Sequence, residues 1–215
     1  MTNGTTPPLH GKARSLAMLG LLTSAMIWGL SWWPLQQLQG MGVHPLWSTS
    51  LMFTLISALI SLQRPASWRI LLSEPSLWLI VLVSGTTNIF FNLGVTSGDV
   101  VRVVLLFYLM PVWTVPLAWL VLREPVRRPA LLRLLIATAG AVVVLWPTQS
   151  AAWSLADLLG LLAGVGFALN TVLLRRAPHA DPTARALAMF VGSAVLGAVL
   201  ALALGVAPPS AWRLD

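Results

Sequence analysis

The chain of 215 residues contains no cysteine, and only 9% of its residues are charged. Without cysteine it can form no disulfide, no thiolate metal site and no thiol nucleophile. Its thirteen basic and six acidic side chains cannot cover a soluble domain, in which about a quarter of the residues are charged. The composition therefore excludes a soluble enzyme.

Hydrophobic residues are abundant instead, at 57%, and the mean hydropathy is +0.84. A transmembrane helix needs about 20 apolar residues, because every backbone polar group must be paired inside lipid. Seven segments meet this requirement, at 16–38, 46–62, 77–95, 100–122, 131–146, 158–174 and 187–206. We predict an all-α membrane protein, a polytopic helical bundle of about seven transmembrane helices. The stretch 63–75 is predicted to be a short amphipathic turn at the membrane surface.

The basic residues separate the apolar segments rather than forming one water-exposed face, so we expect no nucleic-acid partner. Eleven of the thirteen fall on one side of the predicted membrane: Lys12, Arg14, Arg64, Arg69, Arg123, Arg127, Arg128, Arg133, Arg175, Arg176 and Arg185. Basic loops are retained in the cytoplasm. We therefore expect a multi-pass protein of the plasma or inner membrane, with a cytoplasmic N-terminal tail at residues 1–15.

A short internal repeat relates two of the predicted spans. Leu19-Gly20-Leu21-Leu22 recurs 140 positions later as Leu159-Gly160-Leu161-Leu162, and each copy opens a span. Five spans separate the copies, so the two repeats are predicted to be inverted, as is common in secondary transporters. We expect one five-helix repeat at 16–147 and, at 154–215, only the first two helices of a second.

Several motifs carry a family resemblance: Ile27-Trp28-Gly29-Leu30-Ser31, Gly98-Asp99-Val100-Val101-Arg102, the run 106–113 around Pro111, the run 117–124 ending in Leu122-Arg123-Glu124, Ala137-Thr138-Ala139-Gly140-Ala141, and 157–162. They resemble EamA-type transporters of the drug/metabolite transporter (DMT) superfamily, in which a proline-bearing fourth helix ends in a Leu-x-Glu signature before a Gly-rich fifth helix. The resemblance implies a ten-helix carrier of small metabolites, often an exporter of amino acids or related compounds.

Polar residues inside the predicted spans are candidates for solute binding, because they are costly in lipid. Ser84, Asn88 and Asn92 recur every four residues and therefore share one helical face. Their amides could hold a polar solute or could form hydrogen bonds between helices, and both interpretations remain open.

Spans one and six offer a second group of candidates. Ser24, Trp28 and Ser31 share a face, and Trp32 follows one turn after Trp28 as a possible gate. Asn170 and Thr171 occupy the positions that match Leu30 and Ser31 under the repeat. Ordinary packing is the alternative role of the two tryptophans.

Arg102 is a basic residue inside a predicted span, three positions after Asp99. It could form an outer-surface ion pair with Asp99, or it could bind a solute carboxylate through two parallel hydrogen bonds. Glu74, Asp99, Asp157 and the other acidic residues fall near predicted ends. We therefore expect no buried protonatable carboxylate in the spans.

Pro111 and Pro116 each remove a backbone hydrogen bond within span four. A hinge is therefore predicted there, flanked by Tyr108, a further candidate for solute binding, and by Trp113, a candidate gate residue. At the cytoplasmic end of this span Arg123, Glu124, Arg127 and Arg128 are predicted to form a structural charge cluster. Gly160-x-x-x-Gly164 and Ser193-x-x-x-Gly197 are small-residue patterns that predict close helix packing.

The sequence contains no catalytic constellation within its spans, and it suggests no metal or cofactor. We expect an alternating-access carrier that moves a small polar or amphipathic metabolite across the bilayer, with export as the expected direction. The alternative is a truncated or non-transporting chain that needs another polypeptide to complete its bundle, and a homodimer is one such arrangement.

Overall fold

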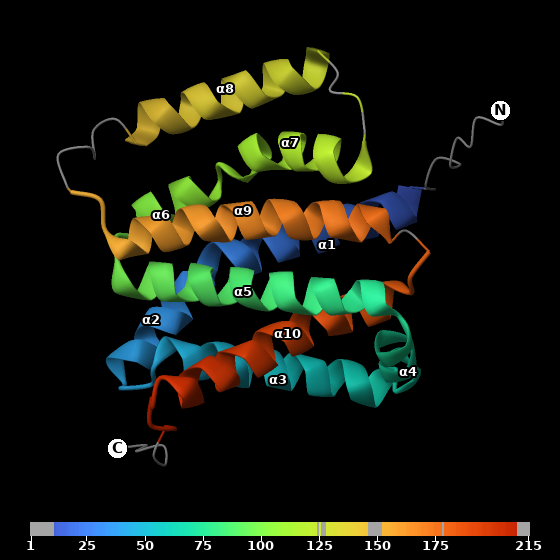
Figure 1. Ribbon diagram of the computed structural model, residues 1–215, viewed down its shortest axis with the longest axis vertical. Coiled ribbons are helices and arrows are strands. Elements are labelled where there is room, and N and C mark those ends of the chain that lie inside the picture. Colours follow the sequence, from blue (N-terminus) through green and yellow to red (C-terminus); the bar gives the residue numbers. More distant parts are fainter. Residues whose placement is uncertain (1–10, 124, 126–127, 146–151, 178, 210–215) are drawn as a thin grey trace.

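A computed structural model describes residues 11–123, 125, 128–145, 152–177 and 179–209 of the chain. All regular secondary structure in these residues is α-helical (Figure 1). The helices are α1 (Gly11–Leu30), α2 (Trp32–Gly40), α3 (Pro45–Gln63), α4 (Ala66–Ser73), α5 (Pro75–Ser97), α6 (Val100–Phe107), α7 (Met110–Leu122), α8 (Arg128–Leu145), α9 (Leu155–Arg176) and α10 (Pro182–Ala203).

Six segments of the described chain are long and apolar enough to cross a membrane. They are Met18–Gly40, Pro45–Gln63, Pro75–Ser97, Val100–Leu122, Leu155–Arg176 and Pro182–Ala203. The remaining predicted span corresponds to α8. The predicted all-α polytopic membrane bundle is therefore confirmed, and the amphipathic stretch after the second span is the short helix α4.

Two of the crossings are broken into shorter helices. The first consists of α1 and α2, which meet at Ser31, and the fourth consists of α6 and α7, which meet at Tyr108 and Leu109. A proline lacks the N–H that the carbonyl four residues earlier would accept, and its ring clashes with that carbonyl. Pro34 and Pro111 follow the last residues of α1 and α6 by four positions, which explains where both helices end.

The helix starts are defined by prolines and polar caps. Pro45, Pro75 and Pro182 occupy the first helical positions of α3, α5 and α10, where a missing N–H has no cost. Ser154 and Asp157 form a capping box at the start of α9, in which each side chain accepts a hydrogen bond from the other's backbone N–H. These signals define where the crossings of α3, α5, α9 and α10 begin.

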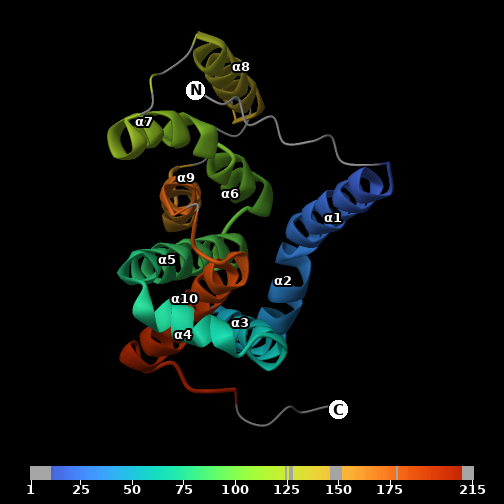
Figure 2. The same cartoon turned by 90° about the vertical axis from the view of Figure 1, so that its right-hand side faces the viewer.

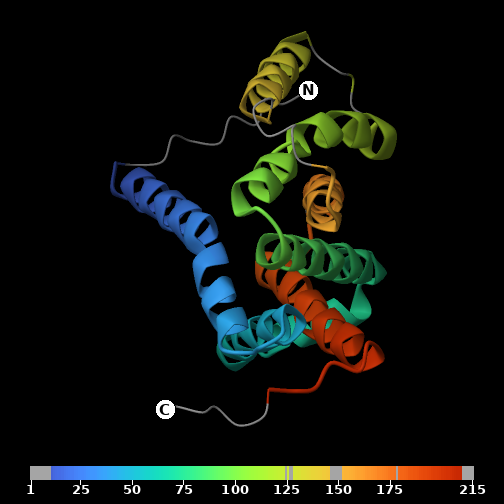
Figure 3. The ribbon, with the colours of Figure 1, turned by 90° about the vertical axis from the view of Figure 1, so that its left-hand side faces the viewer.

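Helix α5 lies at the centre of the bundle, packed between α9 on one side and α10 with α3 on the other (Figure 2). Its residues Leu77, Ile80 and Val95 are completely buried. By contrast, α1 leans away from this centre and α8 lies at the periphery beyond α7 (Figure 3). The first span is 6% buried, against 56% for the span of α5.

Glycines let the central helices approach to backbone contact. A Cβ on Gly160 would lie 2.8 Å from the Val103 carbonyl oxygen, and one on Gly164 would lie 2.8 Å from that of Phe107. Val103 and Phe107 are one turn apart on α6. The Gly160-x-x-x-Gly164 pattern of α9 therefore lets α6 pack closely along α9. The second predicted pattern also packs closely, since a Cβ on Gly197 would lie 3.1 Å from the Leu46 carbonyl oxygen of α3.

The tightest approach joins α5 and α10, where a Cβ on Gly192 would overlap the Val81 carbonyl. We expect Gly192→Ala to lower the free energy of unfolding by about 1–3 kcal/mol, because the two backbones must separate. Thermal unfolding of the purified protein in detergent measures this loss. Gly20→Ala is the matched control: a Cβ there meets nothing within 4 Å. It should leave stability unchanged or slightly raised, since alanine is the better helix former. Equal melting temperatures for the two variants would contradict the packing described here.

Candidate functional site: a cavity at two helix breaks

A cavity of about 160 Å³ lies where the two broken crossings face each other. It is lined by Trp28, Gly29, Trp32, Phe91, Val104, Phe107, Tyr108, Met110 and Phe167. Trp28 and Trp32 flank the break between α1 and α2, and Tyr108 and Met110 flank the break between α6 and α7. Both proline-induced breaks therefore contribute to one cavity wall.

Aromatic rings form a continuous series along this cavity. The Trp28 and Phe91 ring centroids are 6.3 Å apart, and those of Phe91 and Phe107 are 4.9 Å apart. The Phe107 ring centroid also lies 5.9 Å from that of Tyr108 and 5.4 Å from that of Phe167. The series joins α1, α5, α6 and α9, and pairs at these separations contribute about 0.5–1.5 kcal/mol each beyond their buried area. Most of the lining is apolar, which suits the apolar body of an amphipathic molecule.

The predicted face of span one is only partly at this cavity. Trp28 and Trp32 line it. Ser31 lies at the helix break, half-buried, and its hydroxyl donates to the Trp28 carbonyl at 2.9 Å. Ser24 lies on an exposed part of α1 and is not in the cavity lining.

The polar stripe of α5 forms hydrogen bonds to three different helices. The Ser84 hydroxyl donates to Asn170 Oδ1 of α9 at 3.0 Å. The Asn88 amide donates to the Ser193 hydroxyl of α10 at 2.8 Å, and the Asn92 amide donates to Thr49 Oγ1 of α3 at 2.7 Å. These side chains lie in helix interfaces rather than in the aromatic cavity. Of the two interpretations of the stripe, the geometry favours interhelical bonding.

The polar pair of span six separates in the same way. Asn170 is buried against Ser84, whereas Thr171 is half-buried and donates to the Phe167 carbonyl of its own helix at 2.9 Å. Neither is in the cavity lining, although Phe167, one turn earlier, is. In span six the cavity is therefore lined by an aromatic ring rather than by the predicted polar groups.

Arg102 forms an ion pair with a residue other than the expected Asp99. Its Nε lies 3.0 Å from Asp157 Oδ1, and its guanidinium carbon lies 5.7 Å from the centre of the Trp153 ring. Asp99 instead caps α6, accepting a hydrogen bond from the backbone N–H of Arg102 at 3.1 Å. The expected Asp99 pairing is replaced by this cap because a carboxylate at a helix start is drawn to the free N–H groups of the first turn.

A second prediction, that the spans contain no buried carboxylate, is wrong at Asp157. It is 2% exposed and lies within the crossing Leu155–Arg176. Its burial is possible because it accepts from the Ser154 N–H at 2.8 Å and faces Arg102, so its charge is compensated on two sides. Its position near the end of a predicted span gave no sign of that compensation.

The two prolines of the fourth crossing differ in effect. Pro111 accompanies the break after Phe107, whereas α7 continues through Pro116. Trp113, a predicted gate residue, is half-buried in α7. Its indole N–H is buried and has no hydrogen-bond partner in the part of the chain that the structure describes. A break at Tyr108 is thus observed where a hinge was predicted.

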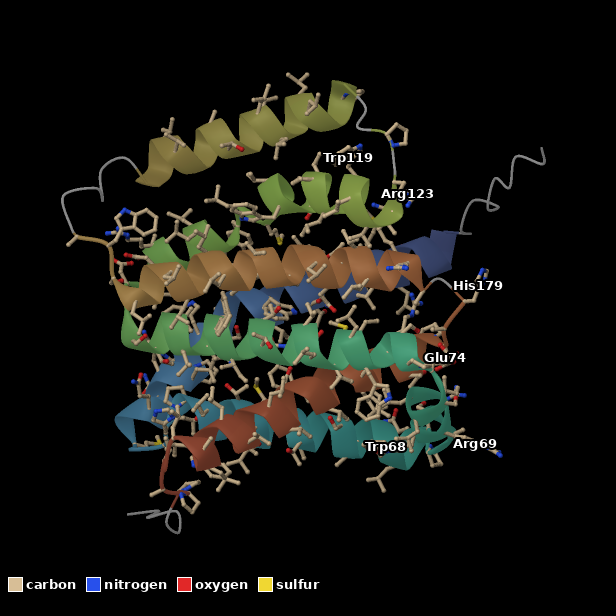
Figure 4. The ribbon with its side chains drawn as sticks, viewed as in Figure 1. Trp68, Arg69, Glu74, Trp119, Arg123 and His179 are labelled. Carbon is tan, nitrogen blue, oxygen red and sulfur yellow. The ribbon has the colours of Figure 1, made fainter. Side chains whose placement is uncertain are left out.

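Basic residues gather at one end of the bundle. Arg64, Arg69, Arg123, Arg175, Arg176 and Arg185 lie there, at the helix ends opposite Arg102. Figure 4 shows Arg69, Glu74, Arg123 and His179 at this end, together with Trp68 and Trp119. We call it the arginine-rich end.

The predicted charge cluster belongs to the arginine-rich end. Arg123 closes α7 in a left-handed conformation with φ 55° and is exposed. Glu124 and Arg127 lie outside the described residues, as does the side chain of Arg128. A second cavity, of about 520 Å³, lies between α5 and the α9–α10 connection and is lined in part by Glu74, Ser76, Arg176 and His179.

Sequence reasoning missed several cavity residues: Gly29, Phe91, Val104, Phe107, Met110 and Phe167. The predicted solute contacts were chiefly polar side chains, whereas the lining of the cavity is chiefly aromatic. A usable signal was present for part of the cavity, since Pro34 and Pro111 mark two breaks, and Trp32, Phe107 and Tyr108 lie within about one turn of them. Comparing the two prolines would have pointed to Trp32, Phe107 and Tyr108 together.

Comparison with known proteins gives one match. The family model described as the EamA-like transporter family matches residues 15–146. No curated protein and no solved structure matches. The matched range contains α1 to α8 almost completely, including both helix breaks, and α9 and α10 follow it. Because the match covers more than half of the sequence, this chain belongs to the EamA-like transporter family of the DMT superfamily, a family of membrane transporters of small solutes.

Proposed function

We propose that this chain is an alternating-access carrier that exports a small amphipathic metabolite, such as an amino acid with an apolar side chain. The observation that carries the proposal is the meeting of two broken crossings at one aromatic cavity. Secondary transporters commonly form their solute sites from discontinuous helices near the middle of the bilayer. Export is the direction that the EamA resemblance favours.

The cavity defines the kind of solute proposed. Its volume of about 160 Å³ is below the range of about 300–1,000 Å³ that is typical of drug-sized ligands. Trp28, Phe91 and Phe107 would cover an apolar group, and the Tyr108 hydroxyl could donate to or accept from a polar one. Stacking against a cationic amine would add a further attraction.

The proposed motion uses the helix breaks as hinges. At Ser31 and at Tyr108 the helical hydrogen-bond ladder is already interrupted, so bending there breaks few additional bonds. The proposed membrane is the plasma or inner membrane. The inverted relation of the two repeats remains part of this proposal, supported by the short motif that recurs near the start of the first crossing, Met18–Gly40, and near the start of α9.

The cavity predicts a specific effect on apparent solute affinity. We expect Trp28→Ala to raise KM roughly tenfold for an apolar amino acid, because a large ring of the cavity wall is lost. Uptake and efflux in proteoliposomes, measured with a panel of labelled amino acids, would give KM and the maximal rate.

Trp119→Ala is the matched control, since Trp119 is 59% exposed on α7 and does not line the cavity. It should leave KM unchanged. Asn92→Ala should lower the melting temperature by removing the bond to Thr49, also with little change in KM. An unchanged KM in Trp28→Ala would contradict a solute site in this cavity. Absence of transport by the folded wild type would favour the non-transporting or homodimeric alternative.

Orientation provides a separate prediction, because basic residues favour the cytoplasmic side. Ser73 ends α4 at the arginine-rich end, and Ser97 ends α5 at the other, and both are exposed. The absence of cysteine makes single-cysteine labelling free of background. In intact cells, a membrane-impermeant thiol reagent should label Ser97→Cys and spare Ser73→Cys until the cells are opened. The reverse pattern would place the arginine-rich end outside.

A further inference from the structure

The ion pair between Arg102 and Asp157 joins the first turn of α6 to the first turn of α9. Both side chains are largely withdrawn from solvent, with exposed fractions of 11% for Arg102 and 3% for Asp157. A charge-assisted bond of 3.0 Å in such surroundings is stronger than a surface pair, but losing one partner leaves the other charge poorly compensated. The ion pair therefore restricts movement of α6 relative to α9.

Each partner is also oriented by its own helix start. Asp157 accepts from the Ser154 N–H and is held in the capping box. Asp99 accepts from the Arg102 N–H and fixes the first turn of α6, while the Trp153 ring lies 5.7 Å from the guanidinium carbon. The guanidinium thus lies against a carboxylate and an aromatic ring of the segment that begins α9. Its partners come from this chain, whereas a solute-binding arginine would present its donors to the cavity.

The ion pair continues a line of contact between the same two helices. Val103 packs on Gly160 and Phe107 packs on Gly164, so α6 is fixed to α9 from its first turn to its last residue. These helices supply Val104, Phe107 and Phe167 to the cavity. Displacement of α6 relative to α9 would therefore change the shape of the cavity wall.

We propose that Arg102 and Asp157 act as positioning residues, forming an interhelical clamp that holds α6 on α9 and keeps this wall of the cavity rigid during transport. The clamp depends on the proposed solute cavity. It gives Arg102 a carboxylate partner within the chain, Asp157, in place of a solute carboxylate. Asp157 lies beyond the family-matched range and Arg102 lies within it, so the clamp attaches the matched helices to α9.

The test uses four forms of the clamp: wild type, Arg102→Gln, Asp157→Asn and the double neutral variant. Asp157→Asn retains an oxygen that can accept from the Ser154 N–H, so it removes the charge but preserves the cap. Each form carries Val104→Cys in the otherwise cysteine-free chain. The rate at which a small thiol reagent labels this cysteine reports on the wall without requiring transport.

We expect each single variant to be labelled roughly tenfold faster than the wild-type clamp, and the double variant to be no faster than the faster single variant. Such non-additivity arises because both substitutions remove the same interaction. Asp181→Asn is the matched control, since Asp181 caps α10 at the arginine-rich end through the Ala184 N–H. It should leave labelling unchanged. Independent, multiplicative effects of the two substitutions, or unchanged labelling in both, would overturn the clamp.

Transport separates the clamp from solute binding by Arg102. The clamp predicts that Arg102→Gln and Asp157→Asn alter KM for anionic and neutral solutes by the same factor. Selective loss of anionic solutes in Arg102→Gln, with unchanged labelling of Val104→Cys, would overturn the clamp in favour of a solute carboxylate site. Altered labelling together with an absence of transport in every form would refute the proposed function and leave the clamp supported.

Discussion

The bundle depends on close backbone approach and interhelical hydrogen bonds, because lipid supplies little hydrophobic force to drive one apolar helix onto another. Helix α5 provides both. Its Gly85 meets Gly192 of α10, and its Ser84, Asn88 and Asn92 bond to α9, α10 and α3. One such hydrogen bond contributes only about 0.6 kcal/mol on average, so the arrangement depends on their distribution over three neighbours. The polar stripe thereby holds α5 against three neighbours, of which α9 lines the cavity together with α5.

The cavity arises where prolines interrupt two helices, because backbone polar groups that a proline leaves unpaired cannot face lipid. Pro34 and Pro111 interrupt two crossings, and each interruption must be buried in protein or line a cavity. Gly164 packs on the Phe107 carbonyl at one break, and Ser31 donates to the Trp28 carbonyl at the other. The breaks are thus partly compensated within the bundle, and aromatic side chains surround the space that remains.

The sequence predicted the helical segments well because apolar length is a one-dimensional property, and the glycine patterns similarly identified α9 as a packing surface. It could not say which residues meet. Asn88 could bond to a solute or to another helix, and only the packing of α10 shows Ser193 opposite it. Arg102 was considered with its neighbour Asp99, whereas its carboxylate comes from Asp157, far along the chain. Such pairings are set by tertiary structure, which local spacing does not encode.

Helix α9 makes the site depend on residues outside the family-matched range. It contributes Phe167 to the cavity, Asn170 as a hydrogen-bond partner of the polar stripe, and Asp157 to the ion pair. Its Gly160 and Gly164 form the surface on which α6 packs. Helices α1 to α8 alone would leave Arg102 without this carboxylate and the Phe107 ring without Phe167. A buried arginine in that state would draw water toward the first turn of α6. The aromatic cavity is therefore a product of the contact between the matched helices and α9, so a change on either side of that contact acts on the same wall.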